Sequence, residues 1–150
     1  MIPDTSGRAT KDVIDILIDQ HEQLKVWMAQ VANPAAADRA EAFEAVAELL
    51  EHHEHGEQKV IHAATRHAAQ AGQLAGERME EEQHASKALN ELRKLGVDAP
   101  EFPGKFADFR DAVLEHAQHE EQEEFPLLRR AIDGETLVRM ARDLRAAEGL

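Results

Sequence analysis

The chain has 150 residues, of which 43% are hydrophobic and 31% are charged, and its formal net charge is −13 at pH 7. This length and composition fit one folded domain (1-150), and the negative charge argues against nucleic acid or an anionic membrane as a partner. No apolar run approaches the roughly 18 residues of a membrane span, and residues 1–4 do not resemble the start of a secretory signal. Cysteine is absent, which excludes disulfides, thiolate zinc sites and iron–sulfur clusters. We therefore expect a single soluble, cytoplasmic domain.

The residue usage favours helices. Tyrosine is absent and aromatic residues make up 4% of the chain, whereas alanine, glutamate and leucine are abundant. These abundant residues have high helix propensity, and the β-branched and aromatic residues that suit strands are few. We therefore expect an all-α protein.

The first half of the chain has the pattern of two long helices. Thr10 is a candidate N-cap for the first helix, whose apolar residues recur at helical spacing until residues 33–34 end it. Asp38, with Glu41 three residues later, has the pattern of a capping pair at the start of a second helix. The apolar stripe of this second helix fades by residues 70–72.

The second half predicts two more long helices. A third helix spans roughly residues 73–95, with Gly96 as its C-cap, and residues 98–104 form the longest loop. A fourth helix runs from about residue 105 to residue 131, and Pro126 should kink it.

Gly134 separates a short fifth helix, over about residues 135–147, from the bundle of about residues 10–132. Long helices joined by short connections must run antiparallel to their neighbours. The expected architecture is an up-down-up-down four-helix bundle with a short C-terminal fifth helix.

Each of the four long helices interrupts its apolar stripe with a histidine, and two of them add a glutamate four residues later. A histidine on an apolar face is usually a hydrogen-bonded core residue, but buried carboxylates cost several kcal/mol each unless they are paired or coordinated. Side chains four residues apart lie on one helix face and can reach one centre. A metal centre would compensate the charge of the carboxylates and bind neutral imidazoles. The residues concerned are His21, His53, Glu57, His84, His116 and Glu120.

The fourth helix offers two pairs with the same spacing. His116 and Glu120 continue the stripe of Phe109 and Val113, whereas the face of His119 and Glu123 is mostly polar. We therefore expect His119 and Glu123 at the edge of the core.

The second helix also contains competing histidines. His53 is followed four residues later by a glutamate, whereas His52 and His55 are followed by a glycine and a lysine. His62 and His67 have no carboxylate at that spacing, so we expect them on the surface or around the ligands rather than among them.

The residue types narrow the choice of metal. Imidazole and carboxylate without sulfur suit iron, manganese or zinc, and six ligands exceed what one tetrahedral zinc ion takes, which favours two metal ions. Ferritin-like di-iron bundles need Glu-x-x-His on two helices, and here it occurs once, from Glu81 to His84. The ferritin pattern is therefore not met.

Four segments together resemble the hemerythrin-like, or HHE cation-binding, family over about residues 12–131. They are His21, His53-Glu54-His55-Gly56-Glu57, Glu81-Glu82-Gln83-His84, and His116-Ala117-Gln118-His119-Glu120-Glu121 running into Phe125-Pro126. The resemblance implies a carboxylate- and oxo/hydroxo-bridged centre of two iron ions. Its implied ligands are His21, His53, Glu57, His84, His116 and Glu120.

One position departs from the oxygen-carrying members of that family, which have a second histidine one turn before the position of His84. Glu80 stands there in this chain. Four histidines, two bridging carboxylates and one oxo bridge leave about two of the twelve positions of two octahedral irons open. Glu81, Glu80 and Glu54 are further candidate ligands that could close them.

The resemblance implies a di-iron protein that reacts with the small ligands O2, H2O2 or NO. Decomposition of peroxide, catalase-like or peroxidase-like, is the preferred enzymatic form, because open metal positions permit Lewis-acid and redox chemistry. The alternatives are a non-enzymatic protein for oxygen or iron binding, storage or sensing, and a helical interaction module with an adventitious histidine cluster. The sequence leaves the substrate, the redox partner and the oligomeric state open.

Overall fold

A computed structural model describes residues 11–33 and 37–149 of the chain, so Thr10, the candidate N-cap, and Pro34 lie outside the described residues. The described residues are helical throughout their regular structure, without a strand, as expected. None of these helices is long and apolar enough to cross a membrane. In chain order the elements are α2 (Val13–Ala32), α3 (Arg39–Gly56), η1 (Glu57–Ile61), α4 (His62–His67), α5 (Gly72–Leu95), α6 (Phe102–His119), η2 (Glu120–Glu124), α7 (Phe125–Ala131) and α8 (Gly134–Glu148).

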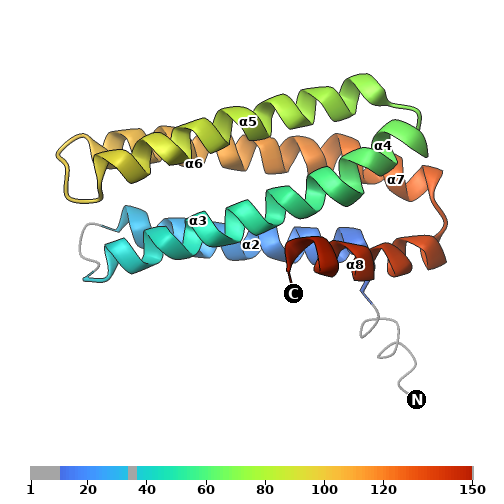
Figure 1. Cartoon of the computed structure of the whole chain (residues 1–150), viewed down its shortest axis with the longest axis horizontal. Coiled ribbons are helices and arrows are strands. Elements are labelled where there is room, and N and C mark those ends of the chain that lie inside the picture. The colour runs from blue at the N-terminus through green and yellow to red at the C-terminus, as the bar shows by residue number, and fades with distance from the viewer. Residues whose placement is uncertain (1–10, 34–36, 150) are drawn as a thin grey trace, which may run out of the picture.

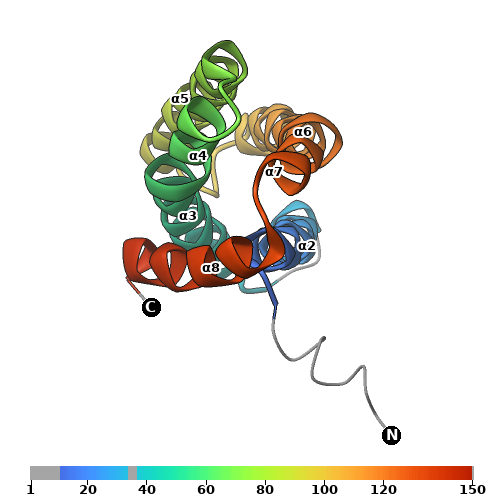
Figure 2. The same cartoon turned by 90° about the vertical axis from the view of Figure 1, so that its right-hand side faces the viewer.

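The helices form four rods packed side by side. The segments α3, η1 and α4 follow one another without a break, as do α6, η2 and α7, and α2 and α5 complete the bundle (Figure 1). Figure 2 looks along the rods and shows α8 lying across α2 and the α3 rod on one side of the bundle. The expected four-helix bundle with a short C-terminal fifth helix is confirmed.

The helix ends agree only in part with the sequence patterns, and the N-cap of α2 is Asp12 rather than the predicted Thr10. The helix α2 begins after a capping box, in which Asp12 accepts a hydrogen bond from the backbone N–H of Asp15 at 2.9 Å and Asp15 accepts one from that of Asp12 at 3.1 Å. Asp38 does precede α3, but its side chain makes no capping hydrogen bond, so that part of the prediction is wrong. Gly96 ends α5 with a φ of 90°, as expected of a C-cap glycine.

The loop before α6 is shorter than predicted. The helix already begins at Phe102, and Pro103 occupies its first turn. Proline is tolerated there because its missing N–H would have no partner within the helix. The pair Pro103-Gly104 was therefore wrongly interpreted as loop.

Two π-helical segments interrupt the second and fourth rods, η1 beginning at Glu57 and η2 at Glu120. A π turn holds an extra residue, so the face that the rod presents to the core shifts beyond it. In the fourth rod this irregular turn ends two residues before Pro126, the residue at which the sequence predicts a kink.

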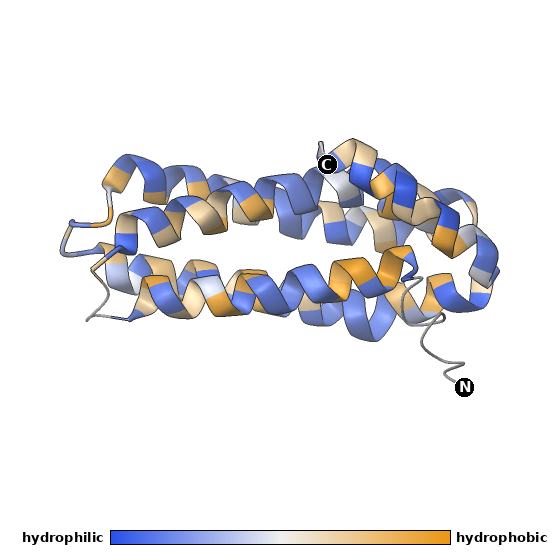
Figure 3. Ribbon diagram, turned by 90° about the horizontal axis from the view of Figure 1, so that it is seen from below, coloured by the Kyte–Doolittle hydropathy of each residue, from blue (hydrophilic) through white to orange (hydrophobic). Residues whose placement is uncertain are grey.

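Two separate apolar clusters flank a buried polar belt. One cluster contains the phenylalanines of α3 and α6 together with Leu24, Met28 and Leu89, and the other joins the start of α2 to α7 and α8. Along α2 and along the two rods that contain η1 and η2, buried histidines and glutamates lie between these clusters, and Figure 3 shows hydrophilic residues in the middle of the bundle. The fold thus holds these buried histidines and glutamates in a layer between two hydrophobic clusters.

Candidate metal centre

Buried histidines and glutamates from all four rods meet in this belt. Each has a relative exposure of 6% or less. Five of the six ligands predicted from the sequence are among them. The cluster consists of His21 from α2, His53 and Glu57 from α3 and η1, His62 from α4, Glu82 from α5, and His116, Glu120 and Glu124 from α6 and η2.

The first donor set, set A, contains His21, His53, Glu57 and Glu120, with ligand atoms all within 4.8 Å of one another. Nε2 of His21 lies 3.2 Å from Nε2 of His53 and 3.1 Å from Oε1 of Glu120. Oε2 of Glu57 lies 3.2 Å from Nε2 of His53. These four side chains could hold one cation.

The second donor set, set B, contains Glu57, Glu82, His116 and Glu120, again within 4.8 Å. Nε2 of His116 lies 3.2 Å from Oε2 of Glu82, 3.3 Å from Oε2 of Glu120 and 3.8 Å from Oε1 of Glu57. Nε2 of His62 adjoins the same oxygens, at 2.6 Å from Oε2 of Glu82 and 4.0 Å from Oε2 of Glu120. His62 is thus a fifth candidate donor for set B.

Glu57 and Glu120 belong to both sets, and each presents a different oxygen to each. Oε2 of Glu57 and Oε1 of Glu120 face the imidazoles of set A, whereas Oε1 of Glu57 and Oε2 of Glu120 face His116 of set B. This is the arrangement that two carboxylates need in order to bridge two adjacent cations.

The four buried imidazoles share one orientation. In each, Nε2 faces donor set A or B, and the Nδ1–H group donates a hydrogen bond to a side chain that belongs to neither set. An outward partner of this kind fixes the tautomer and the ring orientation of a metal-binding histidine. The donations run from His21 to Glu121 at 2.6 Å, from His53 to Gln20 at 2.7 Å, from His62 to Glu124 at 2.9 Å and from His116 to Glu81 at 2.8 Å.

The unpaired atoms of the cluster fit a pair of cations. Neither oxygen of Glu57 or Glu120 has a hydrogen bond, although both side chains are fully buried. A buried polar atom without a partner costs about 1–3 kcal/mol, and more when it is charged. Nitrogens about 2.1 Å from one ion and at right angles to it lie about 3.0 Å apart, close to the separation of the His21 and His53 nitrogens. The donor set therefore suits bound metal better than a vacant core.

Burial and mutual repulsion set the charges at set A. Burial, followed by the neighbouring His21, lowers the pKa of His53 to about 3, so this ring is neutral at physiological pH, as a ligand must be. Burial, followed by the charge of Glu120, holds the pKa of Glu57 well above its usual range. Burial also works to raise the pKa of Glu120, but His116 outweighs it and holds that pKa well below its usual range.

In set B, hydrogen bonds and neighbouring charges together shift the pKa values of His62 and Glu82 more than burial does. Burial alone would lower the pKa of His62, but its bonds to Glu124 and Glu82 raise the pKa to about 10. Burial alone would raise the pKa of Glu82, but His116 and His62 lower it to about 2. Without a cation, the proton of His62 balances part of the negative charge of set B, and a metal ion would replace that proton.

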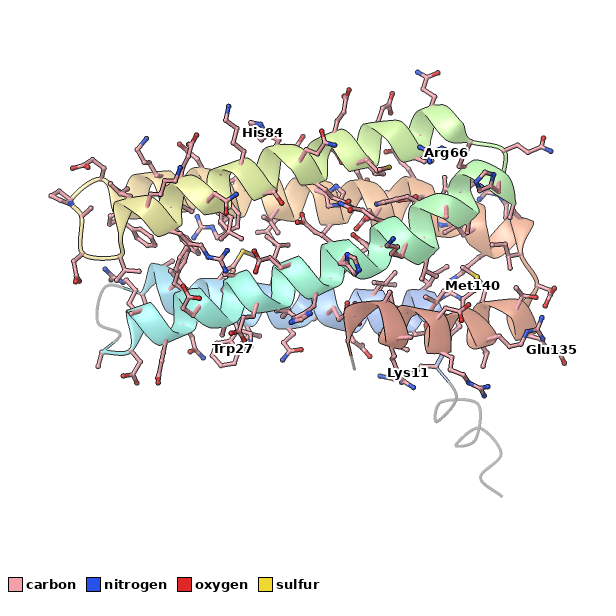
Figure 4. All side chains as sticks on the ribbon, viewed as in Figure 1. Lys11, Trp27, Arg66, His84, Glu135 and Met140 are labelled. Carbon is pink, nitrogen blue, oxygen red and sulfur yellow. The ribbon has the colours of Figure 1, made fainter. Side chains whose placement is uncertain are left out.

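His84 and Glu80 do not reach the cluster. Both side chains are exposed on α5, and Figure 4 shows His84 pointing away from the bundle. Together with Glu81 they line a surface cavity of about 540 Å³ between α5 and α6. The prediction that His84 lies on the inward face of the third helix is wrong, because the buried face of α5 is the neighbouring one. The buried residues of α5 are Ala75, Arg78, Glu82, Ala85, Leu89 and Leu92.

Glu81 and Glu54 lie next to the donor sets without belonging to them. Glu81 accepts hydrogen bonds from Nδ1 of His116 and, at 2.7 Å, from Nδ1 of His119, and it forms an ion pair with Arg78. Glu54 is buried beside Ser86, whose hydroxyl group donates to it at 3.3 Å. Burial, followed by the charge of Glu82, raises the pKa of Glu54 to about 8.

His62 is buried more deeply than its sequence pattern indicates. It was expected on the surface or around the ligands; its exposure of 0% excludes the surface, and its Nε2 faces set B. The π-helical segment η1 begins at Glu57 and ends directly before His62. Because a π turn holds an extra residue, Glu57 and His62 share a face at a spacing of five residues rather than four. The expectations for the other histidines are confirmed, since His52, His55 and His67 are exposed and His119 lies at the edge.

A small cavity adjoins set A. It measures about 10 Å³ and is lined by His21, His53 and His116 together with apolar side chains of α2, α3 and α6. A cavity of this size is just large enough for one water-sized molecule. The centre thus has a neighbouring space that only very small molecules fit.

Comparison with known proteins agrees with this geometry. The family model of the hemerythrin HHE cation binding domain matches residues 12–128, most of the chain and all of the cluster. The chain belongs to the hemerythrin family. As a hemerythrin HHE domain it is a cation-binding protein, and the buried donor sets could hold a cation.

The hemerythrin fold is also found in a solved structure. The crystal structure of a hemerythrin HHE cation binding domain-containing protein from Mycobacterium kansasii matches with a TM-score of 0.81 and 18% sequence identity, over 93% of this chain and 86% of that chain. This likeness supports the fold. A comparison with curated proteins found no match.

Proposed function

We propose that this hemerythrin-family protein binds two iron ions, one in set A and one in set B, and that the centre reacts with O2, H2O2 or NO. The observation that carries the proposal is the division of the oxygens of Glu57 and Glu120 between the two sets. Iron is preferred because the donors are imidazole and carboxylate without sulfur, and because the family binds cations.

The ligands proposed here differ from those expected from sequence in two places. His62 takes the role expected of His84, and Glu82 joins the ligands from α5. Set A then has four protein donors and set B has five, His62 included. The metal in set A therefore has more room for an external ligand, and the small cavity lies on that side.

Bound iron would supply one-electron redox chemistry and Lewis acidity. The protein contributes the rest. The outward hydrogen bonds of the four histidines hold their Nε2 atoms free to bind metal, and the two apolar clusters exclude bulk water. The cavity next to His21, His53 and His116 is just large enough for one water-sized molecule, which favours very small substrates.

Decomposition of H2O2 to water and O2 is the reaction that we propose for this centre. Glu81 and Glu121 add negative charge around His116 and His21, which favours oxidised iron over the stable ferrous form that reversible oxygen carriage requires. The cytoplasm is the compartment that we propose, since the chain has no cysteine.

The test uses protein purified without a histidine tag, loaded with ferrous iron and titrated separately with O2 and H2O2. We expect two irons per chain and O2 release equal to half the peroxide consumed, with the Glu120→Gln variant inactive. A stable oxygen complex that reverses on degassing, with no peroxide turnover, would favour the non-enzymatic alternative of oxygen binding or sensing. An iron content near zero would contradict the iron centre, and the absence of every metal ion would favour a helical interaction module.

A further inference from the structure

The C-terminal helix α8 reaches the proposed metal centre through one glutamine. Gln20 of α2 lies between Glu148 of α8 and His53 of α3. Its Nε2 group donates to Oε1 of Glu148 at 2.9 Å, and its Oε1 accepts from Nδ1–H of His53 at 2.7 Å. Three helices are thus linked by two hydrogen bonds that end on a donor of set A.

The direction of these two bonds is fixed by Glu148. A carboxylate only accepts hydrogen bonds, so the NH2 group of Gln20 must face Glu148 and the amide oxygen must face His53. That oxygen requires a proton on Nδ1 of His53, which leaves the lone pair of Nε2 for a metal. With the amide reversed, its NH2 group would face Nδ1, and the proton would move to Nε2, inside the donor set.

The close packing of α8 on α3 holds Glu148 in place. A Cβ atom at Gly56 would lie 2.6 Å from Cδ1 of Leu144 and 2.8 Å from Cγ of Glu148, so any larger residue there would displace these two side chains of α8. Gly56 also directly precedes Glu57, the first residue of η1. The contact between the helices is therefore made at the donor set itself.

His53 differs from the other three buried histidines in its partner. The Nδ1–H groups of His21, His62 and His116 donate directly to carboxylates, whereas that of His53 donates to a neutral amide. An amide can turn over and a carboxylate cannot, so only His53 needs a further group to define its tautomer. Glu148 is buried, with an exposure of 2%, and supplies that group.

We propose that Glu148 is a positioning residue for the metal of set A, acting through Gln20 on the tautomer of His53. The helix that carries it lies beyond residues 12–128, the part of the chain that matches the family model. This inference rests on the proposed function, because His53 must be a ligand for its tautomer to matter. It makes α8 a part of the metal site and not only a cover for the bundle.

The first measurement is the 15N NMR spectrum of the metal-free protein, which distinguishes the two tautomers of neutral imidazole. We expect the Nδ1–H tautomer for His53 in the parent protein and a mixture in Glu148→Leu and in Gln20→Leu. Glu148→Gln retains an acceptor oxygen and should be intermediate. Asp143→Leu, at an exposed position of the same helix, is the matched control and should leave the spectrum of His53 unchanged.

The second measurement is titration with Co²⁺. The parent protein should bind two ions, and Glu148→Leu should lose about 10- to 100-fold in affinity at one site only, the usual effect of removing a hydrogen-bond partner of a ligand. Gln20→Leu should cause the same loss, and the double variant no more, because both act through one path. Gly56→Ala should weaken the same site.

The outcomes separate the two proposals. Two Co²⁺ ions bound equally well by the parent, Glu148→Leu and Gln20→Leu would overturn the role of Glu148 while leaving the metal centre intact. No Co²⁺ binding by the parent would overturn the proposed function instead, and the tautomer of His53 in the variants would still decide whether Glu148 controls it. A loss at both sites, shared by Asp143→Leu, would show a general effect of α8 on stability and would contradict the proposal.

Discussion

Nε2 of His21 and Nε2 of His53 lie 3.2 Å apart, while the Nδ1–H group of each ring donates to a partner outside the cluster. If both rings are neutral, two lone pairs face each other, and nothing between them compensates the repulsion. A cation bound by both nitrogens removes this cost. The same reasoning applies to the unpaired oxygens of Glu57 and Glu120, so metal and fold should depend on each other.

Removal of the metal should therefore destabilise the protein strongly. A buried polar atom without a partner costs about 1–3 kcal/mol, so the oxygens of Glu57 and Glu120 weaken the metal-free fold, and a metal that binds only the folded state adds its binding free energy to stability. Thermal unfolding of the loaded and the chelated protein measures the difference. Equal melting temperatures would contradict a metal in this cluster.

The metal-free protein should lose stability as the pH rises, in part through Glu54. Its pKa is about 8 in the folded state, against 4.5 for an unperturbed glutamate, so the folded state holds a proton that the unfolded state lacks between these values. This contribution is complete below about pH 4.5 and is lost as the pH rises through 8, by up to about 1.4 kcal/mol per pH unit.

Glu54→Gln mimics the protonated side chain and removes this dependence. In urea unfolding of the metal-free protein, the variant should match the parent near pH 4.5 and exceed it in stability at pH 8. Glu91→Gln, at an exposed position of α5, should follow the parent throughout. A difference that does not change with pH would mean that Glu54 is ionised in the folded protein.

Two histidine substitutions distinguish the structural site from the site expected from sequence. His62→Ala should reduce the metal content from two ions per chain towards one, because His62 faces set B. His84→Ala should retain both ions, because the side chain of His84 lies in solvent. Metal analysis after dialysis measures both variants. The opposite result would mean that α5 turns its other face to the centre.

Enlarging the small cavity should ease the entry of external ligands. Val113 lines it, and Val113→Ala should increase the affinity or the binding rate of azide at the oxidised centre severalfold, as followed by visible absorption. Val46→Ala, in the same apolar cluster but away from the cavity, is the control for the loss of core packing. Equal azide binding by both variants and the parent would place ligand entry elsewhere.

The sequence predicted the fold and most of the buried histidine and glutamate cluster, because both depend on helical periodicity. Histidines at 21, 53 and 116 interrupt clear apolar stripes, and those stripes are buried as expected. The glutamates at 57 and 120 follow at the spacing of one helical turn. The periodicity of a regular α-helix is enough to predict that these residues share a buried face.

Two features of the site could not be derived from regular α-helix. On α5 the buried face contains Arg78 and Glu82, so hydropathy favoured the neighbouring face with Leu74 and His84. Leu89 and Leu92 are the large apolar residues on the buried face. In the second rod the π segment η1 changes the spacing from four to five residues. The sequence shows that His62 follows Glu57 by five residues. This spacing places both side chains on one face only if the helix contains a π turn, which the sequence pattern did not predict.

The central claim is that two metal ions share Glu57 and Glu120. Anomalous diffraction at the iron edge, from crystals of the reconstituted protein, tests this most directly. We predict two peaks inside the bundle, one bounded by His21 and His53 and the other by His62, Glu82 and His116, with both glutamates between them. A single peak, or iron bound at His84 on the surface of α5, would contradict it.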